Sequence, residues 1–186
     1  MVIAWTEAFS NFTIATSGAW TDYDIFTALG VPKGAVCEII VANLDTGNEI
    51  TAGVRTNGSA LTRSLAIHES EDNGANGQAT IMRQMVKTDA NGVIECYASD
   101  YTKITFYLTG YWTGLNWTEA WVARTIAKAE LYGWVNWTLY NTNSVPKGSV
   151  CHIIFANAAA STVANCGVRT HPSGKKRMTA STEAER

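Results

Sequence analysis

The sequence predicts an all-β protein made of tandem antiparallel β-sandwich domains of jelly-roll type, the second of them incomplete. Two observations lead to this fold class. Apolar residues come in short runs between Thr, Ser, Asn and Gly, and only 3 of the 186 residues are prolines, which is typical of short strands joined by turns. In addition, the run Val31–Asn43 recurs at Val145–Asn157, 114 residues downstream, which indicates a duplicated unit.

The repeat extends well beyond that run. Between residues 20–72 and residues 134–186, 20 of 53 positions are identical without a gap. Further upstream, Trp5–Ala8 recurs as Trp117–Ala120. Residues 73–112 have no counterpart in the second copy, so we expect three segments: a complete domain at 1–112, a linker at 113–116 and a truncated copy at 117–186.

Alternating apolar and polar residues between turn signals predict roughly eight strands in the first copy. In chain order they are expected within Ile3–Thr16, with a break near Ser10, and at Asp22–Ile25, Val36–Asn43, Glu49–Thr56, Thr62–Glu69, Gln78–Lys87, Val93–Ala98 and Lys103–Trp112. Asn57-Gly58 is a strong hairpin signal, and Phe26–Gly30 is expected to be a loop or one helical turn. In the second copy, residues 118–131 are interpreted as a strand because they match residues 6–16.

The segment Val36–Asn43 has the clearest strand pattern. Glu38 is replaced by His152 in the second copy, so this position is expected to face water. Alternation then predicts the inward side chains, which are Cys37, Ile39 and Val41 in the first copy and Cys151, Ile153 and Phe155 in the second.

The opposite face of the same strand carries apolar residues that the core does not explain. Ile40 and its counterpart Ile154 fall on this outer face, where a neighbouring domain or chain would cover them. In the last strand Tyr107 and Tyr111 share the outward face. These four residues are the candidate assembly or binding surface.

Two arginines on neighbouring strands recur in the second copy, and we expect them to have structural roles. Arg55 is expected to pack its stem across a tryptophan, and Arg63 to pair with Glu69 or Glu71. The cluster at 68–72 would otherwise suggest a calcium or acid–base site, but a solvated loop rim is favoured. The candidate ion-pair residues are therefore Arg55, Arg63, Glu69, Glu71, Arg169 and Arg177.

The four cysteines are expected to act mainly as small buried hydrophobic residues. Cys37 and Cys151 occupy equivalent inward positions. Cys166 replaces Ala52 and would face Cys151 across a hairpin, so a disulfide between Cys151 and Cys166 is the alternative. The sequence has no Cys-x-x-Cys motif and no histidine pair at ligand spacing, so neither a metal nor another cofactor is expected.

Composition and motifs exclude several functional classes from the prediction. The net charge is −2 and there is no long basic run, so nucleic-acid binding is not expected. No apolar run approaches the ~20 residues of a membrane span, and no catalytic motif is present, so no enzyme is expected. No signal peptide is visible at Met1–Trp5. We expect an extracellular or virion protein, whose signal has been removed or which assembles inside a cell.

Four segments carry a resemblance to a known type of repeat. They are Val31–Asn43, Gly53–Ser59, Asp89–Glu95 and Phe106–Trp112. Together they resemble the tandem β-sandwich repeats of uncharacterised phage virion or tail-associated proteins and of secreted filament-like proteins. The resemblance implies a sandwich building block and brings no catalytic residues.

The incomplete second copy leads to the functional hypotheses. A sandwich without its last three strands would leave backbone donors and acceptors unpaired at an open edge. The first hypothesis is a non-enzymatic structural subunit of an extracellular filament or virion assembly, a homo-oligomer or polymer joined through open sheet edges. A longer natural chain or a self-sufficient half domain are the alternatives for the missing strands. The second hypothesis is a carbohydrate-binding or adhesive module with a glycan partner, because 7 tryptophans and 7 tyrosines offer flat rings.

Overall fold

The computed structural model describes residues 2–68, 79–122, 139, 144–155, 164–167 and 178–181, the last two segments by their backbone alone. The chain divides into two compact units, Met1–Trp121 and Val122–Arg186. The first unit therefore runs past the expected domain end at 112 and includes residues 114–121. Among the described residues, no helix is long and apolar enough to cross a membrane.

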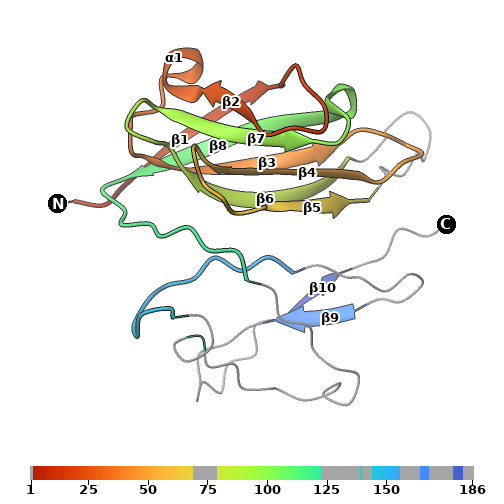
Figure 1. Cartoon of the computed structure of the whole chain (residues 1–186). Helices are drawn as coiled ribbons and strands as arrows, with labels where there is room; N and C mark the ends of the chain where they lie inside the picture. Colours follow the sequence, from red (N-terminus) through yellow and green to blue (C-terminus); the bar gives the residue numbers. More distant parts are fainter. Residues whose placement is uncertain are drawn as a thin grey trace. The chain divides into compact units, whose positions relative to one another are not determined.

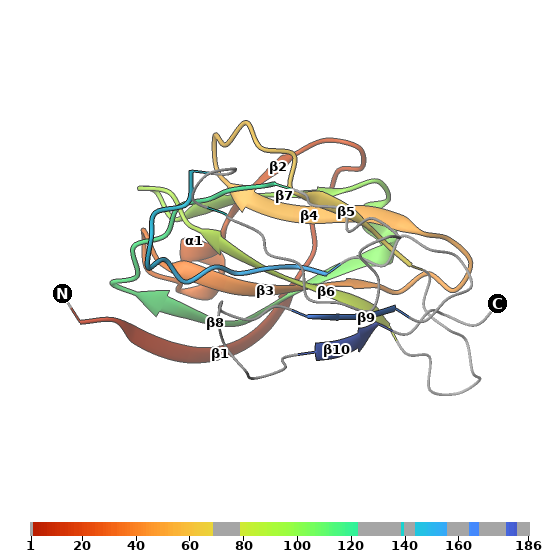
Figure 2. The same ribbon diagram turned by 90° about the horizontal axis from the view of Figure 1, so that it is seen from below.

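The first unit consists of two four-stranded antiparallel sheets, so the all-β prediction is confirmed (Figure 1). One sheet has the order β1-β8-β3-β6 and the other β2-β7-β4-β5, and they form two layers (Figure 2). Only β4 and β5 are consecutive neighbours in one sheet; every other connection crosses between the sheets. The strands are β1 (Ala4–Phe12), β2 (Thr21–Asp24), β3 (Val36–Asn43), β4 (Ile50–Thr56), β5 (Ser64–Ile67), β6 (Thr80–Lys87), β7 (Val93–Ala98) and β8 (Ile104–Thr113).

Short helical turns connect some of these strands. Helix α1 (Ile25–Leu29) is the helical turn expected near Phe26, and its N-cap Asp24 accepts a hydrogen bond from the Thr27 backbone amide at 2.9 Å. It ends at Gly30, which has a left-handed φ of 72°. A 3₁₀ turn, η1 (Tyr101–Lys103), leads into β8.

The core lies between the two sheets. Phe12 of β1 stacks on Phe106 at 5.4 Å and on Tyr23 of β2 at 4.2 Å, so one ring joins the edge strands of both sheets. Burying an aliphatic or phenyl side chain stabilises a fold by roughly 1.5–3 kcal/mol. Fully buried residues at the centre are Ile39, Val41, Phe106 and Leu108 from one sheet and Val54 and Ile94 from the other.

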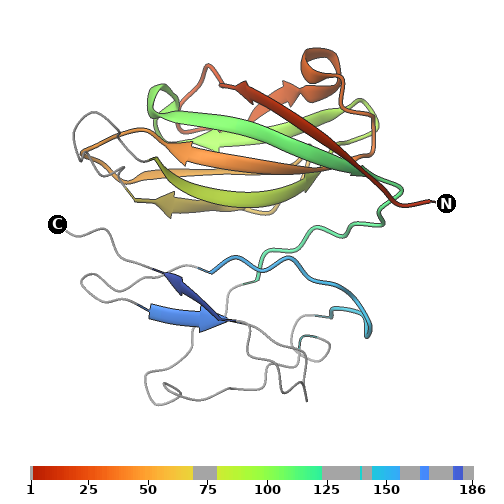
Figure 3. The ribbon, with the colours of Figure 1, turned by 180° about the vertical axis from the view of Figure 1, so that it is seen from behind.

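Strand β3 has the bounds that the sequence predicts and lies between β8 and β6 (Figure 3). Its residues Cys37, Ile39 and Val41 are fully buried, as expected, whereas Ile40 is half-buried on the outer face. Burial raises the pKa of the Cys37 thiol to about 12. This cysteine is therefore a protonated packing residue.

Strand β1 pairs with β8, and its register shifts between Glu7 and Ser10, where the sequence predicts a break. In the part of β1 that precedes this shift, the ring of Trp5 lies directly over Gly110. The two are so close that a Cβ atom at Gly110 would collide with the ring. Trp5 also packs against Trp112, with ring centroids 4.9 Å apart. The absence of a side chain at Gly110 thus creates the space for an indole.

In the second unit, strands β9 (Ala164–Gly167) and β10 (Met178–Ser181) form an antiparallel pair. Their register is that of β4 and β5 shifted by 114 residues. Ala164 pairs with Ser181 and Gly167 with Met178, whereas the first unit pairs Ile50 with Ile67 and Gly53 with Ser64.

Two strands expected in the second copy are not formed in the described residues. Residues 118–122 and 150–155 have no regular structure. Cys151 is exposed and Phe155 is 40% exposed, although both were expected to point inward. In the first unit, by contrast, β3 is held between β8 and β6 by hydrogen bonds on both of its edges.

Candidate functional site

A buried arginine marks the point where β4 and β5 separate. Their ladder ends at Gly53 and Ser64, and beyond it the buried side chain of Gln84, from the opposite sheet, fills the gap. Its Oε1 accepts from the Val54 amide at 2.7 Å, and its Nε2 donates to the Arg63 carbonyl at 2.9 Å. A Cβ atom at Gly53 would collide with that same carbonyl oxygen. The backbone of Arg63 is thus fixed from two sides.

The guanidinium of Arg63 binds a carboxylate from outside the eight-stranded sandwich. One of its terminal nitrogens donates to the Met85 carbonyl at 2.9 Å and to Glu119 Oε1 at 2.7 Å. The same oxygen accepts from the amide and the hydroxyl of Thr56, at 2.9 and 3.2 Å. We call this arrangement of Arg63, Thr56 and the Met85 carbonyl the Arg63 socket.

Arg63 has a partner that the sequence analysis did not identify. It pairs with Glu119; residues 69 and 71 lie outside the described part of the chain, so the expected pairing of Arg63 with Glu69 or Glu71 stays a prediction. Glu119 lies in residues 114–121, which follow β8 and belong to the first unit. A partner 56 positions away cannot be identified from local spacing.

The ion pair is almost completely removed from water. The side chains of Arg63 and Glu119 are 3% and 10% exposed. Burial lowers the pKa of Arg63 because desolvation disfavours the charged form, and the Glu119 carboxylate opposes this shift. The arginine therefore depends on this carboxylate for its compensation.

Three buried polar atoms at this site have no hydrogen-bond partner among the described residues: Arg63 Nε, Glu119 Oε2 and Trp117 Nε1. Trp121 lies beside them, its ring 5.7 Å from the guanidinium carbon. An open depression of about 310 Å³ adjoins the pair. Its lining includes Trp117 and Glu119 together with the turn at 56–59 and Lys87.

The second recurring arginine, Arg55, lies on β4 in a separate cluster on the outer face of the β2-β7-β4-β5 sheet. It pairs with Glu95 at 2.6 Å and donates to the Leu61 carbonyl at 3.2 Å. Its guanidinium lies 4.2 Å from the ring of Trp20, which also packs against Tyr97 at 5.4 Å. Arg55 thus packs on a tryptophan, as expected, and covers one face of that ring.

The structure brings together two members of the expected outer surface, Ile40 and Tyr107, which are directly opposite each other on β3 and β8. Sequence reasoning missed Phe9, which is 76% exposed and stacks on Tyr107 with ring centroids 5.8 Å apart. The register shift in β1 obscures its alternation pattern. We call Phe9, Tyr107 and Ile40 the apolar strip.

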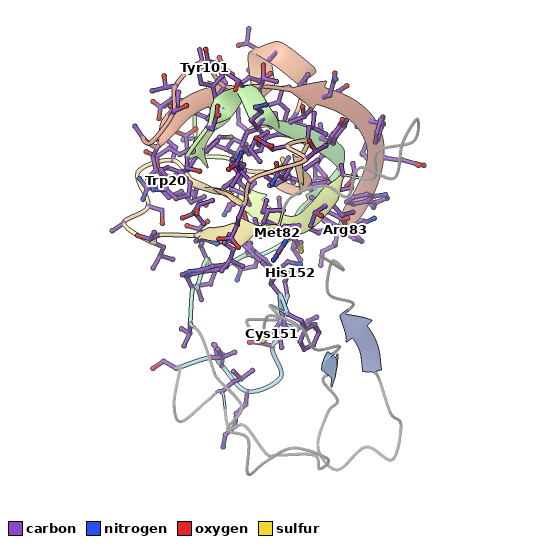
Figure 4. The ribbon with its side chains drawn as sticks, turned by 90° about the vertical axis from the view of Figure 1, so that its right-hand side faces the viewer. Trp20, Met82, Arg83, Tyr101, Cys151 and His152 are labelled. Carbon is purple, nitrogen blue, oxygen red and sulfur yellow. The ribbon has the colours of Figure 1, made fainter. Side chains whose placement is uncertain are left out.

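Polar residues border the strip. Arg83 is paired in register with Ile40 and forms an exposed ion pair with Glu38 at 2.8 Å. Figure 4 shows Arg83 and Trp20 on opposite sides of the first unit, so the strip and the Arg55 cluster belong to different surfaces. Tyr111 lies half-buried further along β8.

The remaining predicted site residues are not gathered with these. Ile154 is half-buried in a segment without regular structure, and residues 169 and 177 lie outside the described part of the chain. The thiol of Cys151 is free and exposed, so the alternative of a Cys151–Cys166 disulfide is not formed in this structure. Within the described residues, no group of His, Cys, Asp and Glu side chains could hold a metal ion.

Comparison with known proteins adds no assignment to this geometry. No family model, no curated protein and no solved structure matches the chain.

Proposed function

We propose that this protein is a non-enzymatic structural subunit of an extracellular filament or virion assembly, built from tandem jelly-roll domains of which the second is completed by another chain. The order β1-β8-β3-β6 over β2-β7-β4-β5 supports the jelly-roll assignment, because connections alternate between two antiparallel sheets. The resemblance of the repeat to phage virion and filament-like proteins points the same way.

One observation carries the proposal. The β9–β10 pair repeats the register of β4–β5, which favours the same fold in the second copy. Residues 150–155, which correspond to β3, are not part of a strand in the described structure. A sequence with strand-forming character and no sheet of its own can form a strand by pairing with a sheet edge of another chain. We infer that strands equivalent to β6 and β8 come from a neighbouring chain.

Particle size tests this function directly. The purified chain is expected to form particles larger than one chain in light scattering and electron microscopy, growing with protein concentration. A synthetic peptide with the β8 sequence, Ile104–Thr113, should occupy the open edge and reduce particle size. A scrambled peptide of the same composition should not. Monomers over the whole concentration range would refute the proposal.

A second function is supported by the depression beside the Arg63 socket. Trp117 lines it together with amide, hydroxyl, ammonium and carboxylate groups, the mixture of a flat ring and polar groups suited to a sugar. The carbohydrate-binding alternative predicts signals on a glycan array that Trp117→Ala abolishes. Trp20→Ala is the control, because Arg55 covers a face of that ring.

A further inference from the structure

We propose that two chains pack face to face through the outer surface of the β1-β8-β3-β6 sheet. Arg83 of each chain then lies over the Tyr107 ring of the other, and the two Ile40 side chains meet between these contacts. The inference rests on the proposed assembly function and adds a contact between chains that uses the first unit alone. It is therefore separate from strand addition at the second copy of the repeat.

The first support is the spacing of the groups on this surface. Ile40 on β3 lies directly opposite Tyr107 on β8 and directly opposite Arg83 on β6. Neighbouring strands lie about 4.8 Å apart, so the ring and the arginine begin at equal distances on either side of Ile40. A twofold axis that runs along β3, between two facing sheets, therefore sets each Arg83 opposite the Tyr107 of the other chain.

The second support is the chemistry of the facing groups. A guanidinium over the face of an aromatic ring is attracted by the π electrons of that ring. Phe9 stacks on Tyr107 with ring centroids 5.8 Å apart, which widens the aromatic surface. The Arg83 side chain is 59% exposed, so it can reach a second molecule. The chain already forms one such contact, because the Arg55 guanidinium lies 4.2 Å from the ring of Trp20.

The third support is the balance of charge at the axis. Glu38 precedes Ile40 by two positions on β3, and its carboxylate accepts a hydrogen bond from Arg83 at 2.8 Å. On a twofold axis along β3 the two Glu38 side chains approach each other, each with an Arg83 beside it. The four charges then alternate in sign around the axis and sum to zero, so the contact leaves no charge without a partner.

The size of the contact fits a repeated assembly better than an isolated dimer. Phe9, 76% exposed, has the most to gain from being covered. A strip of a few side chains nevertheless buries less than the roughly 1,000 Å² that a stable interface needs. The contact is therefore weak by itself and gains strength where many chains repeat it. Covalent trapping is the measurement that suits it.

Cross-linking of the full chain tests the axis. The background carries Cys151→Ser and Cys166→Ser, so that the remaining thiols, those of Cys37 and Cys96, are buried. Ile40→Cys then places one thiol on the axis in each chain. A short bis-maleimide should link two such chains, which a denaturing gel resolves as a dimer.

A thiol away from the axis is the matched control. Asn11 is exposed on β1, two strands from β3 in the same sheet. In the proposed arrangement, the two thiols of an Asn11→Cys pair lie about 19 Å apart, so this variant should give about fivefold less dimer than Ile40→Cys.

Two charge variants, each combined with Ile40→Cys, test the contact between Arg83 and Tyr107. Arg83→Glu turns a carboxylate onto the ring, and Tyr107→Arg sets two cations against each other, so each alone should lower the dimer yield about tenfold. An equimolar mixture of the two variants should restore the yield, because one contact becomes an ion pair and the other keeps an arginine over a ring. Added salt should lower the yield of the mixture more than that of the parent.

The outcomes separate this contact from the assembly function. Circular dichroism checks that each variant is folded; if Tyr107→Arg is not, Tyr107→Leu replaces it and should lower the yield about threefold through loss of the ring. Equal yields from Ile40→Cys and Asn11→Cys, no rescue by mixing folded charge variants, or an unchanged yield in Tyr107→Leu would overturn the inference. Large particles without cross-links at residue 40 would refute only this contact. Cross-linked dimers without larger particles would refute only the assembly.

Discussion

Arg63 and Glu119 form an ion pair at 2.7 Å that ties residues 114–121 to the sandwich. Both side chains are almost completely buried. The net contribution of the pair to stability is therefore the balance between the cost of desolvating the two charges and the attraction between them. The pair positions the segment that leads out of the first unit. Its strength therefore determines how firmly that segment is attached.

Removing one member should be far worse than removing both. We expect Glu119→Leu or Arg63→Met alone to lower the free energy of unfolding of the first unit by roughly 3–5 kcal/mol, because each leaves a buried charge unpaired. The double variant should lie close to the wild type. Urea unfolding of the three variants measures this, and simple addition of the two single losses would contradict it.

Gly53 is expected to tolerate no side chain. Its missing Cβ leaves room for the Arg63 backbone carbonyl, with which an added Cβ would collide. Gly53→Ala should lower the free energy of unfolding by about 1–3 kcal/mol or more, the usual cost of overpacking. Gly47 is a matched control, because a Cβ there meets only Asp45 Oδ1 at an ordinary 3.7 Å. A Gly53→Ala variant as stable as Gly47→Ala would show that the backbone can shift.

The buried amide of Gln84 should be equally sensitive. Gln84→Leu fills similar space but leaves the Val54 amide and the Arg63 carbonyl without their bonds to this side chain. An unsatisfied buried group costs about 1–3 kcal/mol. Arg83→Ala, one residue away and exposed, should change stability by no more than about 1 kcal/mol. Equal losses for both variants, measured by thermal unfolding, would refute the role of the amide.

Acid should weaken the turns that Asp89 holds. Burial alone would raise the pKa of Asp89, but hydrogen bonds from the Val93 amide, the Asn57 side chain and the Asn91 amide together lower it. A carboxylate whose pKa is lowered by folding stabilises the protein above its unfolded pKa of about 3.9, and this stability is lost as the pH falls further. Asp89→Asn should therefore be less stable than the wild type at pH 7, with the difference shrinking below about pH 4. A difference independent of pH would contradict this origin.

The sequence predicted the strands of the first unit well because short alternating runs are bounded by strong turn residues. β3 is the clearest case, since the repeat showed that position 38 tolerates any polar group while its neighbours stay apolar. The Arg63 socket could not be found this way. Its carboxylate lies in a segment that matches β1 in sequence but adopts no strand at 118–122. Local pattern predicts propensity, whereas the partner of a buried charge is chosen by tertiary contacts.

The apolar strip should contribute to association and hardly at all to folding. Phe9 is 76% exposed, so Phe9→Ser removes little buried area and should leave the free energy of unfolding within about 0.5 kcal/mol of the wild type. If the strip is covered by another chain, the same change should reduce particle size in light scattering. Leu44→Ser, which alters another exposed apolar residue outside the strip, is the control and should leave particle size unchanged. Particles of wild-type size in Phe9→Ser would exclude Phe9 from the interface.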